Sequence, residues 1–542
     1  MIKQFKIGQF LSIKVICWAI FLLFLLMIVL VRCRLLNIPL ERDEGEYAYC
    51  GQLLLQGIPP FKLAYNMKLP GVGAVYALLM AIFGQSTQGI HLGFLIVNII
   101  SIILIFFISK RLFGFIAGIF SAISYGILSI SQSVLGAHAH ATHFVVAMAL
   151  GGVLLILKAV ETEENKYVFL SGLFFGLAFL MKQQGVFFIP FGFFYLSWIH
   201  FKNRPALRSG LVFKLVTYSV GTILPFVAIF LVFFFTGVLN KFWFWTFQYA
   251  SQYLSHVPLE IVLKIFKDQL IDVANPFRSI WYIAAFGFAC LFIDGKARKH
   301  IVFVTTLFIA SFITVWPGFI FRQHYFVTVL PIISILVGCC INTTYEFIRD
   351  IKPSSFFKFV PMIIFVELIL CAMYQQKQYL FELTPAQISR LTYGPNPFIE
   401  SMEIANYVKT NSFPNDTIAV LGSEPQICFY SHRRSATGYI YTYALMEKQP
   451  YALRMQQEMT HEIESAKPKY LIFVNVYTSW LRRPESENLI FEWSNKYIST
   501  YYKIVGVVDI VSPDRTNYYW NVEAQNVTPR SPYFVLIYKR QN

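Results

Sequence analysis

The sequence predicts an α-helical multi-pass membrane protein with about eleven transmembrane helices and a C-terminal extracytoplasmic α/β domain. Of its 542 residues, 56% are hydrophobic and only 14% are charged, and the mean hydropathy is +0.56, which is far from the composition of soluble proteins. Apolar runs of membrane length recur as far as residue 376, and none follows it. We therefore expect a membrane domain, 1–376, and a second domain, 377–542.

Twelve apolar windows have roughly the 15 to 25 residues that a bilayer core requires. The first window ends in Arg32 and Arg34 and not in a small-residue cleavage site, so we interpret it as a transmembrane helix and not as a signal peptide. The window at 70–84 is short and contains glycines, which favours a re-entrant or half helix and leaves eleven spans. The windows are 15–33, 70–84, 88–108, 113–133, 144–159, 168–181, 186–200, 212–236, 280–294, 300–317, 325–341 and 356–376.

Basic residues predict the orientation of these spans. With the N-terminus in the cytoplasm, every cytoplasmic loop carries lysine or arginine, as the positive-inside rule requires. The net charge of +16 is then explained by topology and by contact with anionic lipid, and we expect no nucleic acid as a partner. The eight cysteines show no disulfide or zinc spacing, and the composition fits a bacterial inner (plasma) membrane.

The same threading places every unusual polar segment on the extracytoplasmic face. The acidic run ERDEGE at 41–46 follows the first span, a histidine-rich turn lies at 138–143, and the run RQH at 322–324 precedes a late span. The external segment 237–279 contains the run FWFWTF, which we interpret as an aromatic anchor in the headgroup plane, with sugar stacking as the alternative. We expect the functional site on this face.

Short β-branched runs mark the domain after residue 377. Strands are predicted at 417–421, 470–474 and 533–538, and helices near 398–410 and 450–465, an alternation typical of an α/β fold. An odd number of spans places this domain on the extracytoplasmic side too. The loop 422–425 closes the first strand, so its Glu424 either lines a site or belongs to a turn that only the fold needs.

Asp43 and Glu44 are the candidate catalytic acids. A carboxylate at the membrane surface can accept the proton of a hydroxyl group that attacks a lipid-linked substrate. The alternative is a solvated helix cap just outside the bilayer. Basic groups on the same face can stabilise a leaving lipid phosphate electrostatically, although a long basic side chain can also snorkel to headgroups. These basic candidates are Lys68, Lys182, Arg322 and His324.

Several motifs in the membrane region resemble a known family. The runs DEGEYA at 43–48, LLQGIP at 54–59 and NMKLPG at 66–71 are similar to the first external loop of polyprenyl-phosphate-sugar-dependent glycosyltransferases of the GT-C superfold. The branch is the one that includes protein O-mannosyltransferases and the lipid A aminoarabinose transferase. GLAFLMK at 176–182 resembles the family's glycine-rich helix that ends in lysine. HYF at 324–326, followed by Leu330 and Pro331, resembles its late His-Tyr…Leu-Pro helix.

The resemblance covers roughly residues 1–376 and implies a membrane glycosyltransferase. Such an enzyme moves a sugar from a polyprenyl-phosphate donor to a hydroxyl group of an acceptor lipid, glycan or protein. A single displacement with Asp43 as the base inverts the anomeric centre, whereas a covalent route needs a second carboxylate close by. The glycine-rich pieces lack the strand-to-helix context and the lysine of a nucleotide loop, so we expect no nucleotide-sugar donor.

The histidines at 138–143 suggest a metal site, since imidazole is a common ligand. Their spacings do not put all three on one helical face, and the family typically has an acidic residue in this loop, where Thr142 or a histidine stands here. We therefore predict no metal and no other cofactor. His140 and His143, together with Glu424, stay candidates for acceptor binding or for a role in the second external loop.

Two other functions fit a polytopic protein with charges at the membrane surface. A transporter or flippase of lipid-linked glycans should show repeat symmetry and ionisable residues near the middle of the membrane, and we find neither in the sequence. A non-catalytic membrane subunit, whose α/β domain binds a partner, would leave Asp43 dispensable.

Overall fold

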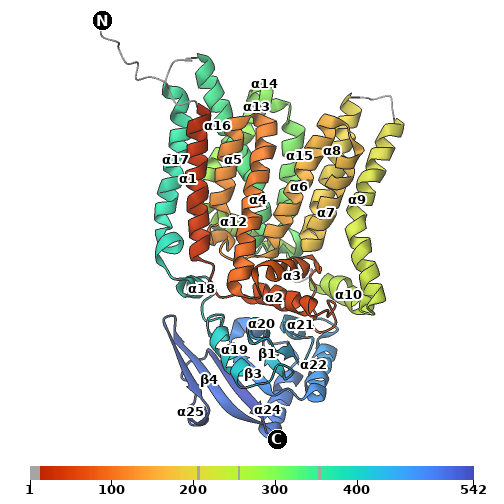
Figure 1. The fold of residues 1–542 in the computed structure, drawn as a ribbon, viewed down its shortest axis with the longest axis vertical. Helices are drawn as coiled ribbons and strands as arrows, with labels where there is room; N and C mark the ends of the chain where they lie inside the picture. The colour runs from red at the N-terminus through yellow and green to blue at the C-terminus, as the bar shows by residue number, and fades with distance from the viewer. Residues whose placement is uncertain (1–12, 204–207, 254–256, 352–355, 542) are drawn as a thin grey trace.

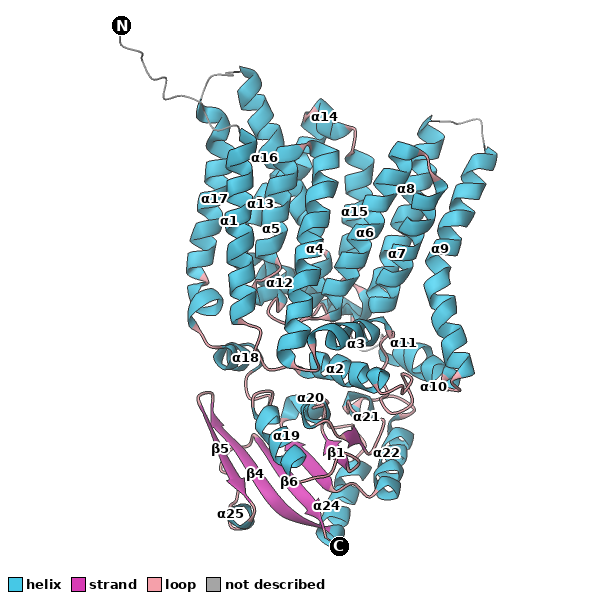
Figure 2. Ribbon diagram, viewed as in Figure 1, coloured by secondary structure: helices cyan, strands magenta, loops and turns pink. Residues whose placement is uncertain are grey.

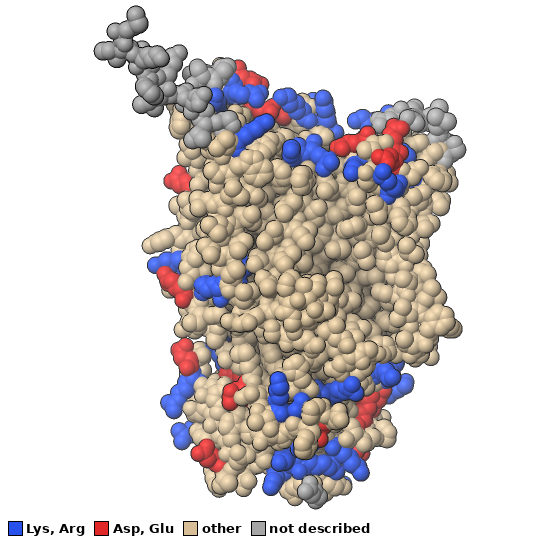
Figure 3. Space-filling view, viewed as in Figure 1, with Lys and Arg blue, Asp and Glu red and all other residues tan. Residues whose placement is uncertain are grey.

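The computed structural model describes residues 13–203, 208–253, 257–351 and 356–541. These residues form three layers, which Figure 1 shows: a bundle of long helices, two short helices across one end of the bundle, and a C-terminal α/β domain beyond them. Figure 3 shows a broad region with few charged side chains on the visible face of the bundle, between charged residues at both ends. Such a region fits the hydrocarbon core of a bilayer.

The bundle confirms the prediction of a multi-pass helical protein. Eight helical stretches of the described residues are long and apolar enough to cross a membrane, and one of them joins α12 (Leu259–Ala274) to α13. Three shorter apolar helices, α5, α7 and α15, run beside them (Figure 1). The eleven helices of the bundle are α1 (Ile13–Arg34), α4 (Thr87–Phe113), α5 (Phe115–Leu128), α6 (Ala141–Thr162), α7 (Asn165–Met181), α8 (Phe188–Asn203), α9 (Arg208–Phe235), α13 (Arg278–Ile293), α15 (Ile301–Ile313), α16 (Leu330–Ile351) and α17 (Val360–Gln375).

Helices α2 (Arg42–Leu55) and α3 (Gly71–Phe83) lie between the bundle and the C-terminal domain (Figure 2). The 13 residues of α3 span about 20 Å. This is less than the roughly 30 Å of a bilayer core, so α3 has the length expected of a half helix. The acidic run forms the start of α2, where Glu41 and Glu44 make a reciprocal capping box. The polar cluster is therefore the beginning of a helix that other elements cover.

A six-stranded mixed sheet forms the centre of the C-terminal domain, with strand order β2-β1-β3-β6-β4-β5. Strand β1 pairs in parallel with β2 and β3, and β6 pairs antiparallel with β3 and β4. The predicted strands are β1, β3 and β6, whereas the hairpin of β4 and β5 has no counterpart in the sequence analysis. The strands are β1 (Thr417–Leu421), β2 (Arg434–Ser435), β3 (Tyr470–Asn475), β4 (Tyr502–Ser512), β5 (Arg515–Trp520) and β6 (Phe534–Arg540).

Helices pack around this sheet and connect it to the membrane region. The two predicted helices are α19 and α22, and α20 follows the carboxyl end of β1. The main helices are α18 (Pro385–Tyr393), α19 (Glu400–Thr410), α20 (Gln426–Ser431), α22 (Ala452–Ala466) and α24 (Leu489–Tyr501), with the short helices α21 (Tyr443–Met446), α23 (Tyr477–Trp480) and α25 (Val522–Gln525).

The C-terminal domain docks on α2 through α20. A Cβ atom at Gly45 would lie 2.8 Å from both the Cβ and the backbone nitrogen of Gln426, so only glycine permits this approach of the two helices. On the bundle side, α2 packs against α3. Helix α2 is therefore enclosed by both domains, which explains why most of its first turn is buried in spite of its charges.

The aromatic segment after α9 packs largely against the C-terminal domain. It forms α10 (Leu239–Trp243), a π-helical stretch Phe244–Tyr249 and α11 (Ala250–Tyr253). The Trp245 ring is buried against Tyr65 and Tyr439, whereas Trp243 is 48% exposed. The expected anchor in the headgroup plane thus applies to only part of the segment, because tertiary contacts cover the rest.

Candidate active site

Asp43 lies in the first turn of α2, where a carboxylate is stabilised by the helix dipole. Its Oδ1 atom accepts a hydrogen bond of 2.8 Å from the Lys68 ammonium, which also pairs with Glu46 at 2.5 Å. Burial alone would raise the pKa of Asp43, but the positive charge of Lys68 outweighs it and holds that pKa below its usual range. The pKa of Lys68 is raised by the same two carboxylates in spite of its burial. Asp43 and Lys68 are therefore both charged at neutral pH.

Asp43 keeps access to solvent, with 20% of its side chain exposed, whereas Glu46 is buried. Among the hydrogen bonds of the described residues, those to Asp43 go to Oδ1 and none to Oδ2. One carboxylate oxygen is thus held by the protein, and the other can receive a proton from a substrate.

His140 and His324 stack beside Asp43, with ring centroids 4.3 Å apart and an angle of 11° between the planes. One ligand atom of each histidine and one of Asp43 lie within 4.8 Å of one another. His140 precedes α6, and His324 lies in the 3-10 turn Gln323–Thr328 before α16. Burial lowers the pKa of His140 to about 3 and that of His324 well below its usual value, so both rings are neutral.

Lys182 ends α7, and its ammonium lies 4.0 Å from the centroid of the Tyr325 ring. The neighbouring Gln183 donates a hydrogen bond of 2.6 Å to the carbonyl oxygen of Met67, which ties the end of α7 to the loop that carries Lys68. Burial, opposed by Asp43 and aided by the charges of Lys68 and Arg322, lowers the pKa of Lys182 to about 7. The basic side chains of Lys68, Lys182 and Arg322 are therefore close enough to influence one another electrostatically.

Glu44 lies in a different environment from Asp43. The sequence predicts Glu44 as a catalytic acid together with Asp43, but successive helical residues point about 100° apart, and Glu44 faces the interior. It is fully buried, and its oxygens bind His91 at 3.0 Å, His138 at 2.7 Å and the backbone N–H of Ala139 at 2.6 Å. Glu44 thus holds the loop before α6 and does not reach the open side of Asp43.

His143 and Glu424 also lie away from the Asp43 carboxylate. His143 is buried in the bundle with its ring 4.7 Å from that of Phe94. Glu424 is fully buried and pairs with Arg42 at 2.8 Å, while Ser479 donates to its other oxygen at 2.6 Å. Neither side chain is thus brought to the open side of Asp43, and an acceptor-binding role for either of them stays a prediction.

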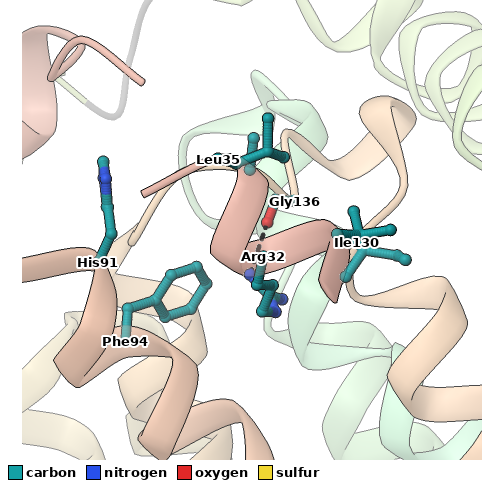
Figure 4. A pocket seen from close by; sticks show the side chains of 8 residues that line it. Arg32, Leu35, His91, Phe94, Ile130 and Gly136 are labelled. Atoms are coloured by element: carbon teal, nitrogen blue, oxygen red, sulfur yellow. Dashed lines mark hydrogen bonds between the residues drawn. The ribbon is translucent and has the colours of Figure 1, made fainter. Parts of the chain in front are cut away.

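A buried arginine fixes the loop that leads to His140. Arg32 donates hydrogen bonds to Asn98 and to the backbone carbonyls of Ser129 and Gly136, and its guanidinium lies 4.4 Å from the centroid of the Phe94 ring. Figure 4 shows Arg32 pointing to Gly136 at the edge of a small cavity. Arg32 from α1 and Glu44 from α2 thus hold the two ends of the segment before His140.

Two site residues were not among the sequence candidates. Glu46 lies three residues after Asp43, and this helical spacing is a signal that could have placed both carboxylates on Lys68. Tyr441 belongs to the C-terminal domain, and its hydroxyl group lies 3.4 Å from Asp43 Oδ1. No pattern near Tyr441 points to the acidic run, which is 398 residues away.

The cluster of Asp43, His140 and His324 has the donor atoms of a divalent metal site. Both ring nitrogens of His140 and the Nδ1 atom of His324 are buried without a hydrogen-bond partner. One carboxylate and two imidazoles are a ligand set that zinc accepts with a fourth position open. The residues present therefore fit a metal ion chemically, although three cationic side chains surround them.

Part of the membrane region matches a family model. Residues 68–246, which include Lys68, His140 and Lys182, match the family model described as dolichyl-phosphate-mannose-protein mannosyltransferase. No curated protein sequence matches the chain.

The fold is similar to solved structures over nearly the whole chain. The structure of ArnT from Cupriavidus metallidurans bound to undecaprenyl phosphate matches with a TM-score of 0.60 and 14% identity, covering 96% of this chain and 98% of that chain. The archaeal oligosaccharyltransferase AglB from Archaeoglobus fulgidus, in complex with an inhibitory peptide and a dolichol-phosphate, matches with a TM-score of 0.50 and 14% identity, covering 96% and 75%. The Archaeoglobus fulgidus oligosaccharyltransferase in complex with Zn and sulfate matches with a TM-score of 0.51 and 13% identity, covering 93% and 73%. The chain is therefore a membrane protein with the GT-C fold, and its resemblance to the polyprenyl-phosphate-sugar-dependent glycosyltransferases of the protein O-mannosyltransferase and aminoarabinose transferase branch is confirmed.

Proposed function

We propose that the protein is a membrane glycosyltransferase that moves a sugar from a polyprenyl-phosphate donor to an acceptor hydroxyl group on the extracytoplasmic face of the inner membrane. One observation carries the proposal: an ionised, partly exposed Asp43 lies beside several cationic side chains at the end of the membrane bundle. In the proposed complex, the lipid phosphate of the donor binds at this end of the bundle, and the sugar attached to it reaches the carboxylate. The fold neighbours bound to undecaprenyl phosphate and to a dolichol-phosphate support a lipid-phosphate donor.

In the proposed reaction, Asp43 acts as the general base. Its free Oδ2 accepts the proton of the acceptor hydroxyl group while that oxygen attacks the anomeric carbon. The bond between the anomeric carbon and the phosphate oxygen breaks, and its electron pair leaves with the polyprenyl phosphate. The described carboxylates nearest to Asp43, those of Glu41, Glu44 and Glu46, are buried. This favours one displacement with inversion over a covalent intermediate.

Lys182 gives the reaction a testable pH dependence. A lysine with a pKa of about 7 is mostly protonated at pH 6 and mostly neutral at pH 8, so its attraction for the donor phosphate falls as the pH rises. We expect the KM for the donor to rise by up to about tenfold between pH 6 and pH 8. Because arginine stays charged throughout this range, Lys182→Arg should remove the dependence. A constant donor KM in the wild type, or an equal rise in Lys182→Arg, would contradict this role.

We expect transfer to be independent of divalent metal ions. Asp43, His140 and His324 would hold such an ion, which would act as a Lewis acid on the leaving phosphate. However, Lys68 already binds Asp43, and the charges of Lys182 and Arg322 disfavour a further cation beside them. The measurement is the transfer rate before and after treatment with EDTA. Loss of transfer that Zn²⁺ or Mn²⁺ restores in the wild type, but not in His140→Ala, would instead assign a metal to this cluster.

Basic residues support the proposed orientation. Lys110 and Arg111 lie in the last turn of α4, and Lys296 and Arg298 lie in α14 (Gly295–Arg298), at the end of the bundle opposite the C-terminal domain (Figure 1). The positive-inside rule favours a cytoplasmic location for this end, and this supports an extracytoplasmic Asp43 and C-terminal domain. Labelling of engineered surface cysteines with a membrane-impermeant reagent, in the C-terminal domain and in α14, measures this orientation.

The function is tested by supplying a panel of radiolabelled polyprenyl-phosphate sugars to membranes that contain the protein. Transfer of label to membrane lipid, glycan or protein would support the proposal and would identify the donor and the acceptor class. Translocation of labelled lipid without transfer would instead support the flippase function. Absence of both transfer and translocation would favour the non-catalytic subunit.

A further inference from the structure

The C-terminal domain contributes a side chain to the site. The segment 438–443 leaves the sheet after β2 and passes beside the first turn of α2. Within it, the Tyr441 hydroxyl group donates a hydrogen bond of 3.4 Å to Asp43 Oδ1, and the centroid of its ring lies 5.6 Å from the Lys68 ammonium. Among the described residues of the C-terminal domain, Tyr441 is thus the one that donates a hydrogen bond to Asp43, the proposed base.

Contacts on both sides hold this segment in place. The backbone N–H of Tyr65, in the first external loop, donates to the carbonyl of Gly438 at 2.7 Å, and a Cβ at Gly438 would lie 2.3 Å from the Tyr65 ring. On the other side, the backbone N–H of Thr442 donates to Ser423 Oγ at 2.9 Å, and the Thr442 hydroxyl donates to the carbonyl of Ser479 at 2.9 Å. Tyr441 therefore sits between two anchored residues and has a fixed position.

The position of Tyr441 relative to the cations defines two sides of Asp43. Lys182 directly follows α7 and His324 lies in the turn before α16, both at the end of the bundle, whereas Tyr441 comes from the domain on the other side of α2 (Figure 2). In a single displacement, the attacking oxygen and the leaving phosphate lie on opposite sides of the anomeric carbon. If the phosphate binds on the side of the bundle cations, the acceptor hydroxyl group approaches from the side of the C-terminal domain.

We propose that Tyr441 is a positioning residue for the attack of the acceptor hydroxyl group. Tyr441 and Lys68 both bind Oδ1 of Asp43, so together they fix the rotation of the carboxylate and aim Oδ2 at the incoming hydroxyl group. This inference rests on the proposed function, and it makes the C-terminal domain part of the active site and not an appended module.

The test compares Tyr441→Phe with Tyr439→Phe in the full-length protein in proteoliposomes. Tyr439 lies in the same segment, but its hydroxyl group donates to Glu458 at 2.8 Å, so its loss should not affect Asp43. With a labelled polyprenyl-phosphate sugar and a membrane extract as the acceptor source, we expect Tyr441→Phe to lower the transfer rate at saturating donor by about three- to tenfold. The donor KM should stay unchanged, and Tyr439→Phe should behave like the wild type.

A second readout requires no turnover. Reaction of Asp43 with a carbodiimide, followed by mass spectrometry, reports how well the carboxylate is shielded, and we expect faster modification in Tyr441→Phe than in the wild type and Tyr439→Phe. Unchanged modification together with unchanged transfer would overturn the proposal, as would a change confined to the donor KM. If the wild type transfers no sugar from any donor while Tyr441→Phe still speeds modification, the contact is supported and the proposed function fails.

Discussion

Replacing Asp43 by asparagine should lower the rate of sugar transfer by about 10²–10⁴-fold, which is the usual contribution of a positioned general base. The amide keeps the size of the side chain and can still accept a hydrogen bond from Lys68, but it cannot take up the acceptor proton. The measurement is transfer from the polyprenyl-phosphate donor identified in the panel, with equal amounts of folded protein. Because the loss is in chemistry and not in binding, we expect kcat to fall and the donor KM to change little.

Glu46→Gln is the matched control for Asp43→Asn. Glu46 lies on the same helix and binds the same Lys68 ammonium, but it is buried and cannot reach a substrate. Glu46→Gln should therefore lower the transfer rate by less than about tenfold, because it binds Lys68 more weakly. Equal losses in the two variants would show that the ion-pair cluster matters as a whole and would remove Asp43 as the specific base. A folded Asp43→Asn protein with wild-type activity would exclude it altogether.

Replacing Glu424 by glutamine should destabilise the attachment of the C-terminal domain by about 3–5 kcal/mol, because it leaves the Arg42 charge buried without its partner. Both side chains are almost completely enclosed, at 8% and 0% exposure. In a domain of this size such a loss lowers the midpoint of thermal unfolding by on the order of 10 °C. The measurement is the unfolding midpoint of the full-length protein in detergent, together with its rate of proteolysis.

A double variant separates the cost of an unpaired charge from the value of the pair. In Arg42→Met with Glu424→Met, both charges are removed, and much of the lost stability should return. The donor and acceptor KM of Glu424→Gln, measured well below its unfolding temperature, should match those of the wild type. A changed acceptor KM with unchanged stability would instead support the predicted role of Glu424 in acceptor binding.

Much of the fold follows from patterns that are local in the chain. The long apolar windows correspond to helices because a bilayer offers no hydrogen-bond partners to a free backbone. The short window at 70–84 contains α3, which lies across the bundle end. The strand at 417–421 is found with the predicted bounds. The hairpin of β4 and β5 was not predicted, although β4 is rich in β-branched residues, whereas β5 is mostly polar and aromatic.

The candidate site was predictable only in part. Asp43 and Lys68 stand in motifs of one external loop, and the structure joins them in an ion pair of 2.8 Å. Glu44 was grouped with Asp43 because adjacent residues look equivalent in a sequence, whereas a helix turns them to different sides. His143 is three residues from His140, yet it faces the bundle interior and packs on Phe94.

By itself, the sequence determined the number of apolar helices, the α/β character of the C-terminal domain and the loop that supplies Asp43, since each of these depends on the order of neighbouring residues. Tertiary structure alone decided that His140 and His324 stack beside that carboxylate, that Glu424 is a structural partner of Arg42, and that Tyr441 reaches Asp43 from another domain. The physical reason is that these contacts join residues far apart in the chain. Their geometry is set by how the helices of the bundle, α2 and the C-terminal sheet pack together, and no local pattern records that packing.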